Sequence, residues 1–148
     1  MATTSNPVLT MLKADHKKVK ALFAEFEDAT ARKREDLART AIQALEVHAE
    51  LEEGLIYPAI RAGIEDAEVM NEAKEEHHLV HVLIAELKEL EPSDETFKAK
   101  FTVLGELVKH HVKEEEGEMF PEAQKAKINW TELQAEVMER KEQLMAQA

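Results

Sequence analysis

Four segments of this chain repeat apolar residues at alternating intervals of three and four, and this spacing fixes the class of fold. On an α-helix such positions share one face, which must be buried against other helices. Two of the stripes are Leu9, Leu12, His16, Val19, Phe23, Phe26 and Ala41, Leu45, His48, Glu52, Leu55. The other two are Ala73, His77, Val80, Ile84, Leu87 and Phe97, Phe101, Leu104, Val108, His111, Glu115. The pattern predicts four amphipathic helices in one bundle.

Short polar connections separate the stripes. The 148 residues include only four Gly and four Pro, which favours long helices. We predict an all-α, antiparallel up-down-up-down four-helix bundle at about residues 7–124, within a single domain spanning 1–148, and a short fifth helix at about 130–146. Ser5 or Asn6 is expected to cap the first helix before Pro7. Pro58 is expected to end or kink the second helix, ahead of a connection at 59–66.

An internal repeat relates the two halves of the chain. HAELEEGLIYP at residues 48–58 aligns with HVKEEEGEMFP at residues 111–121. ADHKKVKALFAEFE, around His16, aligns with EEHHLVHVLIAELK, around His77. The two helical hairpins are therefore expected to be related by a pseudo-two-fold axis.

The repeat also indicates which of two adjacent histidines faces the core. His48 aligns with His111 rather than His110, and His16 aligns with His77 rather than with the histidine after it. Neighbouring helical residues point about 100° apart, so only one of each pair can face inward. The predicted inward polar set is His16, His48, Glu52, His77, His81, His111 and Glu115.

Five imidazoles and two carboxylates in a core predict a metal site. A single histidine on an apolar stripe is more often a satisfied core residue, but here the histidines recur in repeated register with two glutamates. Buried carboxylates need a partner, and histidine with carboxylate accepts iron, zinc or manganese. Seven ligands suit two ions that share two carboxylates. His81, whose repeat partner is Lys20, would give one ion a third histidine and leave the other ion one open position.

At these residues the chain resembles the hemerythrin-like family of HHE cation-binding domains. The matching motifs are DHKKV, HAELEEGLIYP, EHHLVH and HHVKEEEGEMFP, over about residues 8–124. The resemblance implies a non-haem di-iron centre, oxo- or hydroxo-bridged, that binds or reacts with dioxygen. It implies this assignment: one iron on His77, His81 and His111, the second on His16 and His48, and bridges from Glu52 and Glu115.

The chain departs from the family pattern near its last histidine. Hemerythrins often carry an aspartate five residues after that histidine, whereas Glu115 lies four residues after His111. His110 as the ligand would restore the five-residue spacing, and the internal repeat favours His111. We expect Tyr57 mainly to shape the end of the second helix, with a role near the metal as the alternative. The last helix could pack on the bundle or form a dimer contact.

The expected function is dioxygen binding, as a carrier, store or sensor. Neutral imidazoles stabilise ferric iron less than carboxylates do, so the reduction of oxygen is easier to reverse. One alternative is an enzyme that uses the same two irons to decompose hydrogen peroxide or handle nitric oxide, and another is an iron buffer or iron-responsive module. The partner would be dioxygen or another small diatomic or peroxide ligand.

Composition limits the other partners. A net charge of −12 disfavours nucleic acid and anionic membranes. We find no apolar run near 20 residues, no signal-peptide pattern and no cysteine, so we expect a cytoplasmic protein with no membrane span and no disulfide. It is expected to be a monomer or a weak homodimer.

Overall fold

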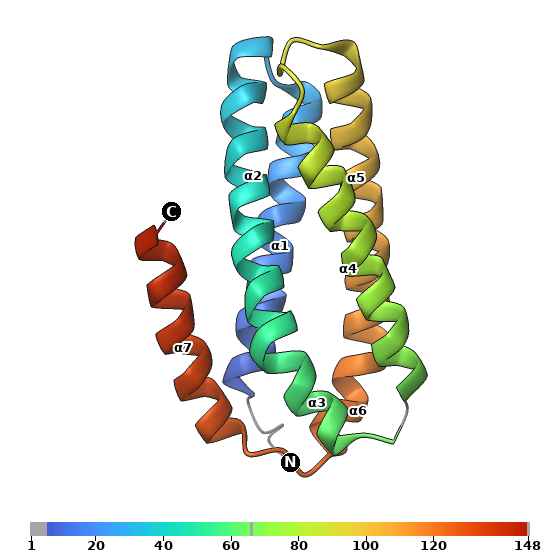
Figure 1. Ribbon diagram of the computed structural model, residues 1–148, viewed down its shortest axis with the longest axis vertical. Coiled ribbons are helices and arrows are strands. Elements are labelled where there is room, and N and C mark those ends of the chain that lie inside the picture. The colour runs from blue at the N-terminus through green and yellow to red at the C-terminus, as the bar shows by residue number, and fades with distance from the viewer. Residues whose placement is uncertain (1–5, 66, 148) are drawn as a thin grey trace.

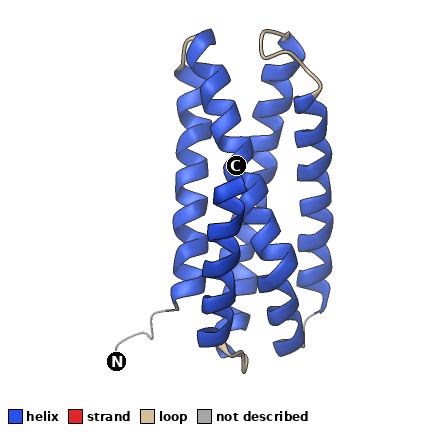
Figure 2. Cartoon of the chain, turned by 60° about the vertical axis from the view of Figure 1, so that its left-hand side comes forward, coloured by secondary structure: helices blue, strands red, loops and turns tan. Residues whose placement is uncertain are grey.

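The computed structural model describes residues 6–65 and 67–147, and within these ranges the chain is helical and has no strand (Figures 1 and 2). The α-helices are α1 (Pro7–Asp28), α2 (Ala31–Leu51), α3 (Tyr57–Gly63), α4 (Ala67–Lys88), α5 (Glu95–Glu114), α6 (Phe120–Lys125) and α7 (Trp130–Gln147). In Figure 1, α1, α2, α4 and α5 run alternately up and down. The predicted four-helix bundle with a short C-terminal helix is confirmed.

Two π-helical turns extend the second helix of each hairpin. The turn η1 (Glu52–Ile56) joins α2 to α3, and η2 (Glu115–Met119) joins α5 to α6. In each turn the N–H that follows donates to the carbonyl five residues earlier, from Tyr57 to Glu52 and from Phe120 to Glu115. Both turns therefore begin at a glutamate that the sequence singles out. Such turns are rare and are frequent at functional sites.

Pro58 was expected to end or kink the second helix, and the first of these alternatives was wrong. The chain stays helical from η1 into α3 and ends only at Gly63. Pro58 lies in the first turn of α3, where the hydrogen-bonding register changes and a missing N–H costs little. Of the expected connection at 59–66, residues 59–63 are helical and residue 66 lies outside the described residues.

The core consists of two apolar clusters with a polar layer between them. The cluster at the end of the bundle that carries α3 and α6 includes Leu9, Leu12, Leu51, Ile56, Met70 and Phe120. The cluster at the opposite end includes Phe23, Phe26, Leu45, Leu87, Phe101 and Leu104. Along α1, His16 lies between Leu12 of the first cluster and Val19 of the second. The predicted polar set therefore lies at mid-height in the bundle.

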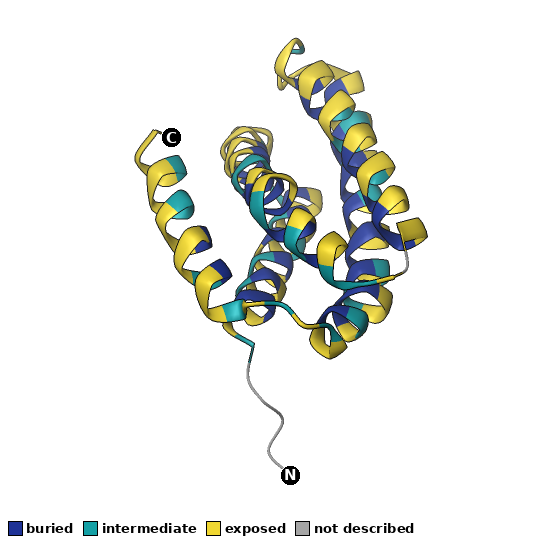
Figure 3. Ribbon diagram, turned by 60° about the horizontal axis from the view of Figure 1, so that its bottom comes forward, coloured by how far each residue is buried: buried dark blue, intermediate teal, exposed yellow. Residues whose placement is uncertain are grey.

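The helix α7 packs on the outside of one hairpin, against α1, α2 and η1 (Figures 1 and 3). Its inward residues Leu133 and Val137 are buried, while its outer face is exposed. Of the two roles left open by the sequence, α7 has the packing role in this structure. The Asn6 side chain caps α1 by accepting from the N–H of Leu9, whereas Ser5 lies outside the described residues. None of the described helices has both the length and the apolar character of a membrane span.

Candidate metal centre

Four helices and the two π-turns bring six of the seven predicted residues together. We call these six residues the buried centre: His16, His48, Glu52, His77, His111 and Glu115. All six are buried, and the two glutamates are 0% and 2% exposed. The glutamates follow His48 and His111 by one helical turn, so each hairpin places an imidazole and a carboxylate on the same inward face.

The buried centre consists of two groups of four ligand atoms that share both glutamates. One group holds His16 and His48, and the other holds His77 and His111; in each group the ligand atoms lie within 4.8 Å of one another. The two Nε2 atoms are 3.2 Å apart in both groups. Glu52 Oε1 lies 3.2 Å from Nε2 of His48 and also 3.2 Å from Nε2 of His77. Each half of the pseudo-two-fold thus supplies the same set of donors.

Each of the four buried histidines has a carboxylate behind it. The Nδ1 distances are 2.7 Å from His16 to Glu116, 3.1 Å from His48 to Asp15, 2.7 Å from His77 to Glu53 and 2.7 Å from His111 to Glu76. We call Asp15, Glu53, Glu76 and Glu116 the outer carboxylates. A proton on Nδ1 leaves Nε2 free to bind an ion, and this arrangement is usual for histidine ligands of metals.

Two of the outer carboxylates were missed in the sequence. Asp15 and Glu76 were not among the predicted site residues. The repeat carried the signal, because Asp15 aligns with Glu76 and each stands directly before a buried histidine.

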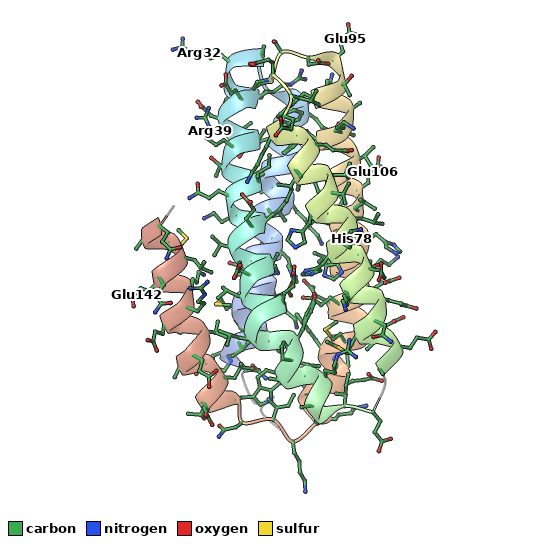
Figure 4. All side chains as sticks on the ribbon, viewed as in Figure 1. Arg32, Arg39, His78, Glu95, Glu106 and Glu142 are labelled. Atoms are coloured by element: carbon green, nitrogen blue, oxygen red, sulfur yellow. The ribbon has the colours of Figure 1, made fainter. Side chains whose placement is uncertain are left out.

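The structure does not bring His81 to the buried centre. Its side chain is 45% exposed, and its Nε2 lies 2.7 Å from Oε2 of Glu53, the same oxygen that lies 2.7 Å from Nδ1 of His77. The reason is that Glu53 already occupies the outward nitrogen of His77, so His81, one turn further along α4, meets Glu53 instead of Glu52. His110 is also outside the centre with 62% exposure, so burial favours His111 over it. His78, labelled in Figure 4, is exposed on α4.

Tyr57 lies where the sequence predicted His81. Its hydroxyl group is 3.0 Å from Nε2 of His111, 3.3 Å from Nε2 of His77, and donates to Glu115. The repeat partner of Tyr57 is Phe120, which stacks on His16 at a centroid distance of 6.2 Å and has no hydroxyl. The two halves of the centre therefore differ by one oxygen atom. The π-turn before Tyr57 aims it inward, and helical periodicity alone could not predict that turn.

The metal-free centre holds its charges by sharing protons. Burial lowers the pKa of His111, but hydrogen bonds to Glu115 and Glu76 outweigh it and raise the pKa to about 10. Burial raises the pKa of Glu52, but the nearby positive charge of His48 outweighs burial and holds the pKa well below the usual range. Burial and the nearby carboxylates raise the pKa of Tyr57 well above its ordinary value.

The donor set fits a metal ion. Both side-chain oxygens of Glu52 and Oε1 of Glu115 are buried and lack a hydrogen-bond partner among the described residues. Unpaired buried carboxylate oxygens are costly, and a cation at the shared position would satisfy all three. Imidazole nitrogen with carboxylate oxygen suits a first-row transition ion.

Residues 8–123 match the Hemerythrin HHE cation binding domain, so the chain belongs to that family. The fold is similar to the crystal structure of a hemerythrin HHE cation binding domain-containing protein from Mycobacterium kansasii. That comparison has a TM-score of 0.79 at 24% identity and covers 99% of this chain and 90% of that one. Family membership and the buried cluster together define a metal-binding helical bundle.

A curated relative shows that this domain also occurs inside a longer protein. The chain is 29% identical over 111 residues to a protein of Nostoc sp. strain PCC 7120 named DNA nickase. The match covers 74% of this chain but 31% of that protein, so the chain spans about a third of its length. The name describes that whole protein, and the net charge of −12 on this chain opposes binding to phosphate.

The metal-free chain is expected to lose stability as the pH rises from about 6.5 to about 10. The pKa of His111 is raised from 6.5 to about 10 on folding. The protonated imidazole therefore contributes its full share of the free energy of unfolding below pH 6.5, and this share is lost as the pH rises through about 10. Chemical denaturation of the metal-free protein, repeated across this pH range, measures the expected fall in the free energy of unfolding. Metal-loaded protein is the control, because an ion replaces these protons and its stability should not show this decline. Equal stability of the metal-free chain at both ends of the range would contradict the assignment.

Proposed function

We propose that this chain is a non-haem di-iron protein that binds dioxygen at the buried centre. The residues that would hold the ions are the six of that centre, with Glu52 and Glu115 shared between them. Iron in such a setting supplies the electrons that dioxygen accepts on binding. The protein's own residues hold the ions, exclude water and shape the space beside them.

The arrangement of the two groups supports two ions rather than one. Six residues make two groups of four only because both glutamates belong to both groups. The outer carboxylates strengthen the four imidazoles as donors and fix their orientation. Four histidines with two bridging carboxylates leave each ion short of six ligands, so there is room for a bridging oxygen and for an external ligand.

A small apolar cavity beside the centre carries the proposal of a diatomic ligand. Its volume is about 40 Å³. It is lined by five of the six residues of the centre (all except Glu115), by Asp15, and by the apolar side chains of Val19, Leu45, Ala49, Val80, Val108 and Val112. A single water needs about 10–15 Å³ by this measure, so the cavity has room for a diatomic molecule. Apolar walls favour a neutral ligand such as dioxygen over an ion.

The Tyr57 and Phe120 pair supports an asymmetric centre. The hydroxyl oxygen of Tyr57 lies within reach of an ion held by His77 and His111, while Phe120 offers no such donor on the other side. We therefore propose that Tyr57 takes the seventh ligand position, which was predicted for His81, and that the external ligand binds the ion held by His16 and His48.

Substitution of Tyr57 by phenylalanine tests this asymmetry. Tyr57 is the only tyrosine in the chain, so any phenolate-to-iron charge-transfer band in the visible spectrum must come from it. We expect the iron-loaded protein to show this band and Tyr57→Phe to lack it, while both irons are retained. An unchanged visible spectrum in Tyr57→Phe would remove Tyr57 from the ligand set.

Gas exchange tests the function. Reduced, iron-loaded protein should take up one dioxygen per chain and release it under vacuum, with the original spectrum restored over repeated cycles. Rapid oxygen evolution from hydrogen peroxide, lost in Glu115→Ala, would identify a peroxide-decomposing enzyme instead. Iron that exchanges readily with a chelator, with neither reaction, would identify an iron buffer.

A further inference from the structure

The outer carboxylates on the two sides of the pseudo-two-fold have different neighbours. Asp15 uses Oδ2 for His48, and its other oxygen lies 3.8 Å from Nζ of Lys141 on α7. Its repeat partner Glu76 uses Oε1 for His111, and its other oxygen lies 3.6 Å from Nε2 of His110. One outer carboxylate therefore faces a fixed cation, and its partner faces an imidazole.

A second carboxylate completes the group around Glu76. Glu114 lies one turn after His110 on α5, with its Oε1 3.1 Å from the same Nε2. The three donor atoms of Glu76, His110 and Glu114 lie within 4.8 Å of one another. They come from α4 and α5, and the side-chain exposures are 22%, 62% and 32%, so the group opens to solvent.

The equivalent place in the other half is closed. The repeat partners of His110 and Glu114 are Val47 and Leu51, both in the apolar cluster under α7. There, α7 covers the surface and Lys141 supplies the positive charge beside Asp15. In the second half the same position carries two carboxylates and one imidazole, and among the described residues no lysine or arginine pairs with Glu76 or Glu114.

We propose that Glu76, His110 and Glu114 form an exterior site for a divalent transition-metal ion, separate from the buried centre. The ion takes the place that Lys141 holds in the other half and balances the two carboxylates. One imidazole nitrogen and carboxylate oxygens suit zinc, ferrous iron or manganese, with water filling the remaining positions. Since Glu76 also holds His111, this ion lies one carboxylate away from the buried centre.

A zinc titration of iron-loaded full-length protein tests the site. Calorimetry should give one more zinc ion per chain for the wild type than for the double variant His110→Ala/Glu114→Gln, and the variant should bind that ion at least about tenfold more weakly. His78→Ala is the matched control, since it removes an exposed histidine on α4 that is not part of the Glu76, His110 and Glu114 group. It should bind zinc as the wild type does.

The wild type and the double variant have the same buried centre, so the difference in zinc binding between them does not depend on whether iron fills it. Iron content and helical circular dichroism, measured on each chain, show that the variant remains folded and that zinc has not displaced iron. Equal zinc stoichiometry and affinity in the wild type and the double variant would overturn the proposal. So would a wild type that binds no zinc beyond the buried centre, or a His78→Ala variant that loses the ion.

Discussion

Replacement of Glu52 by glutamine is expected to release both ions of the proposed di-iron centre, not just one. Glu52 belongs to both groups of ligands, and both of its side-chain oxygens are buried without a hydrogen-bond partner. A neutral amide keeps the shape but removes the negative charge that two nearby cations need. Even partners that lie behind the ligands of a metal cost about 10- to 100-fold in affinity when removed, so a shared ligand should cost at least ~100-fold.

Metal analysis after gel filtration measures this effect. Glu118→Gln is the matched control, because it makes the same change at an exposed position of the other π-turn, η2, and should retain the wild-type metal content. Retention of one ion per chain in Glu52→Gln would show that the carboxylate belongs to a single ion. Retention of both ions would show that Glu52 is a core residue and not a ligand.

Replacement of Phe101 by alanine is expected to cause the largest loss of stability away from the centre. Phe101 is 0% exposed, and its ring centroid lies 4.7 Å from Phe23 and 4.3 Å from Phe26. Removal of a fully buried aromatic ring leaves a cavity and costs about 3–5 kcal/mol. For a chain of this length that loss lowers the melting temperature by roughly 6–20 °C.

Thermal unfolding of the metal-free forms of both variants measures this cost without a contribution from metal release. Val103→Ala is the control on the same helix, because Val103 is 46% exposed and its truncation should change stability by no more than about 0.5 kcal/mol. Phe101→Ala should still bind the wild-type amount of metal, since Phe101 lies in the apolar cluster beyond the polar layer. A cost below about 1 kcal/mol would mean that the bundle repacks around the lost ring.

The parts predicted from sequence are those that depend on helical periodicity and the repeat. Spacings of three and four residues are enough to place His16, His48, His77 and His111 on inward faces, because a helix of fixed geometry leaves no other choice. The repeat then distinguishes His111 from His110, and burial agrees with it. Glu52 could be placed on the inward face in the same way, because it lies one helical turn after His48.

The parts not predicted depend on local departures from that periodicity and on contacts between helices. The π-turns shift the register by one residue after each glutamate, and this shift carries Tyr57 inward, where a continuous α-helix was not expected to place it. His81 satisfied the helical spacing, but its Nε2 contacts Glu53 from another helical segment, and its side chain stays half exposed. Periodicity within one helix contains no information about that neighbour.

The metal content of the 148-residue chain, expressed with iron and purified without chelator, tests the central claim most directly. Elemental analysis should find two irons per chain, because the two groups of ligands share both Glu52 and Glu115 and neither group is complete without them. One zinc per chain, or no metal, would contradict the di-iron centre and leave a bundle whose buried histidines and glutamates balance one another through shared protons.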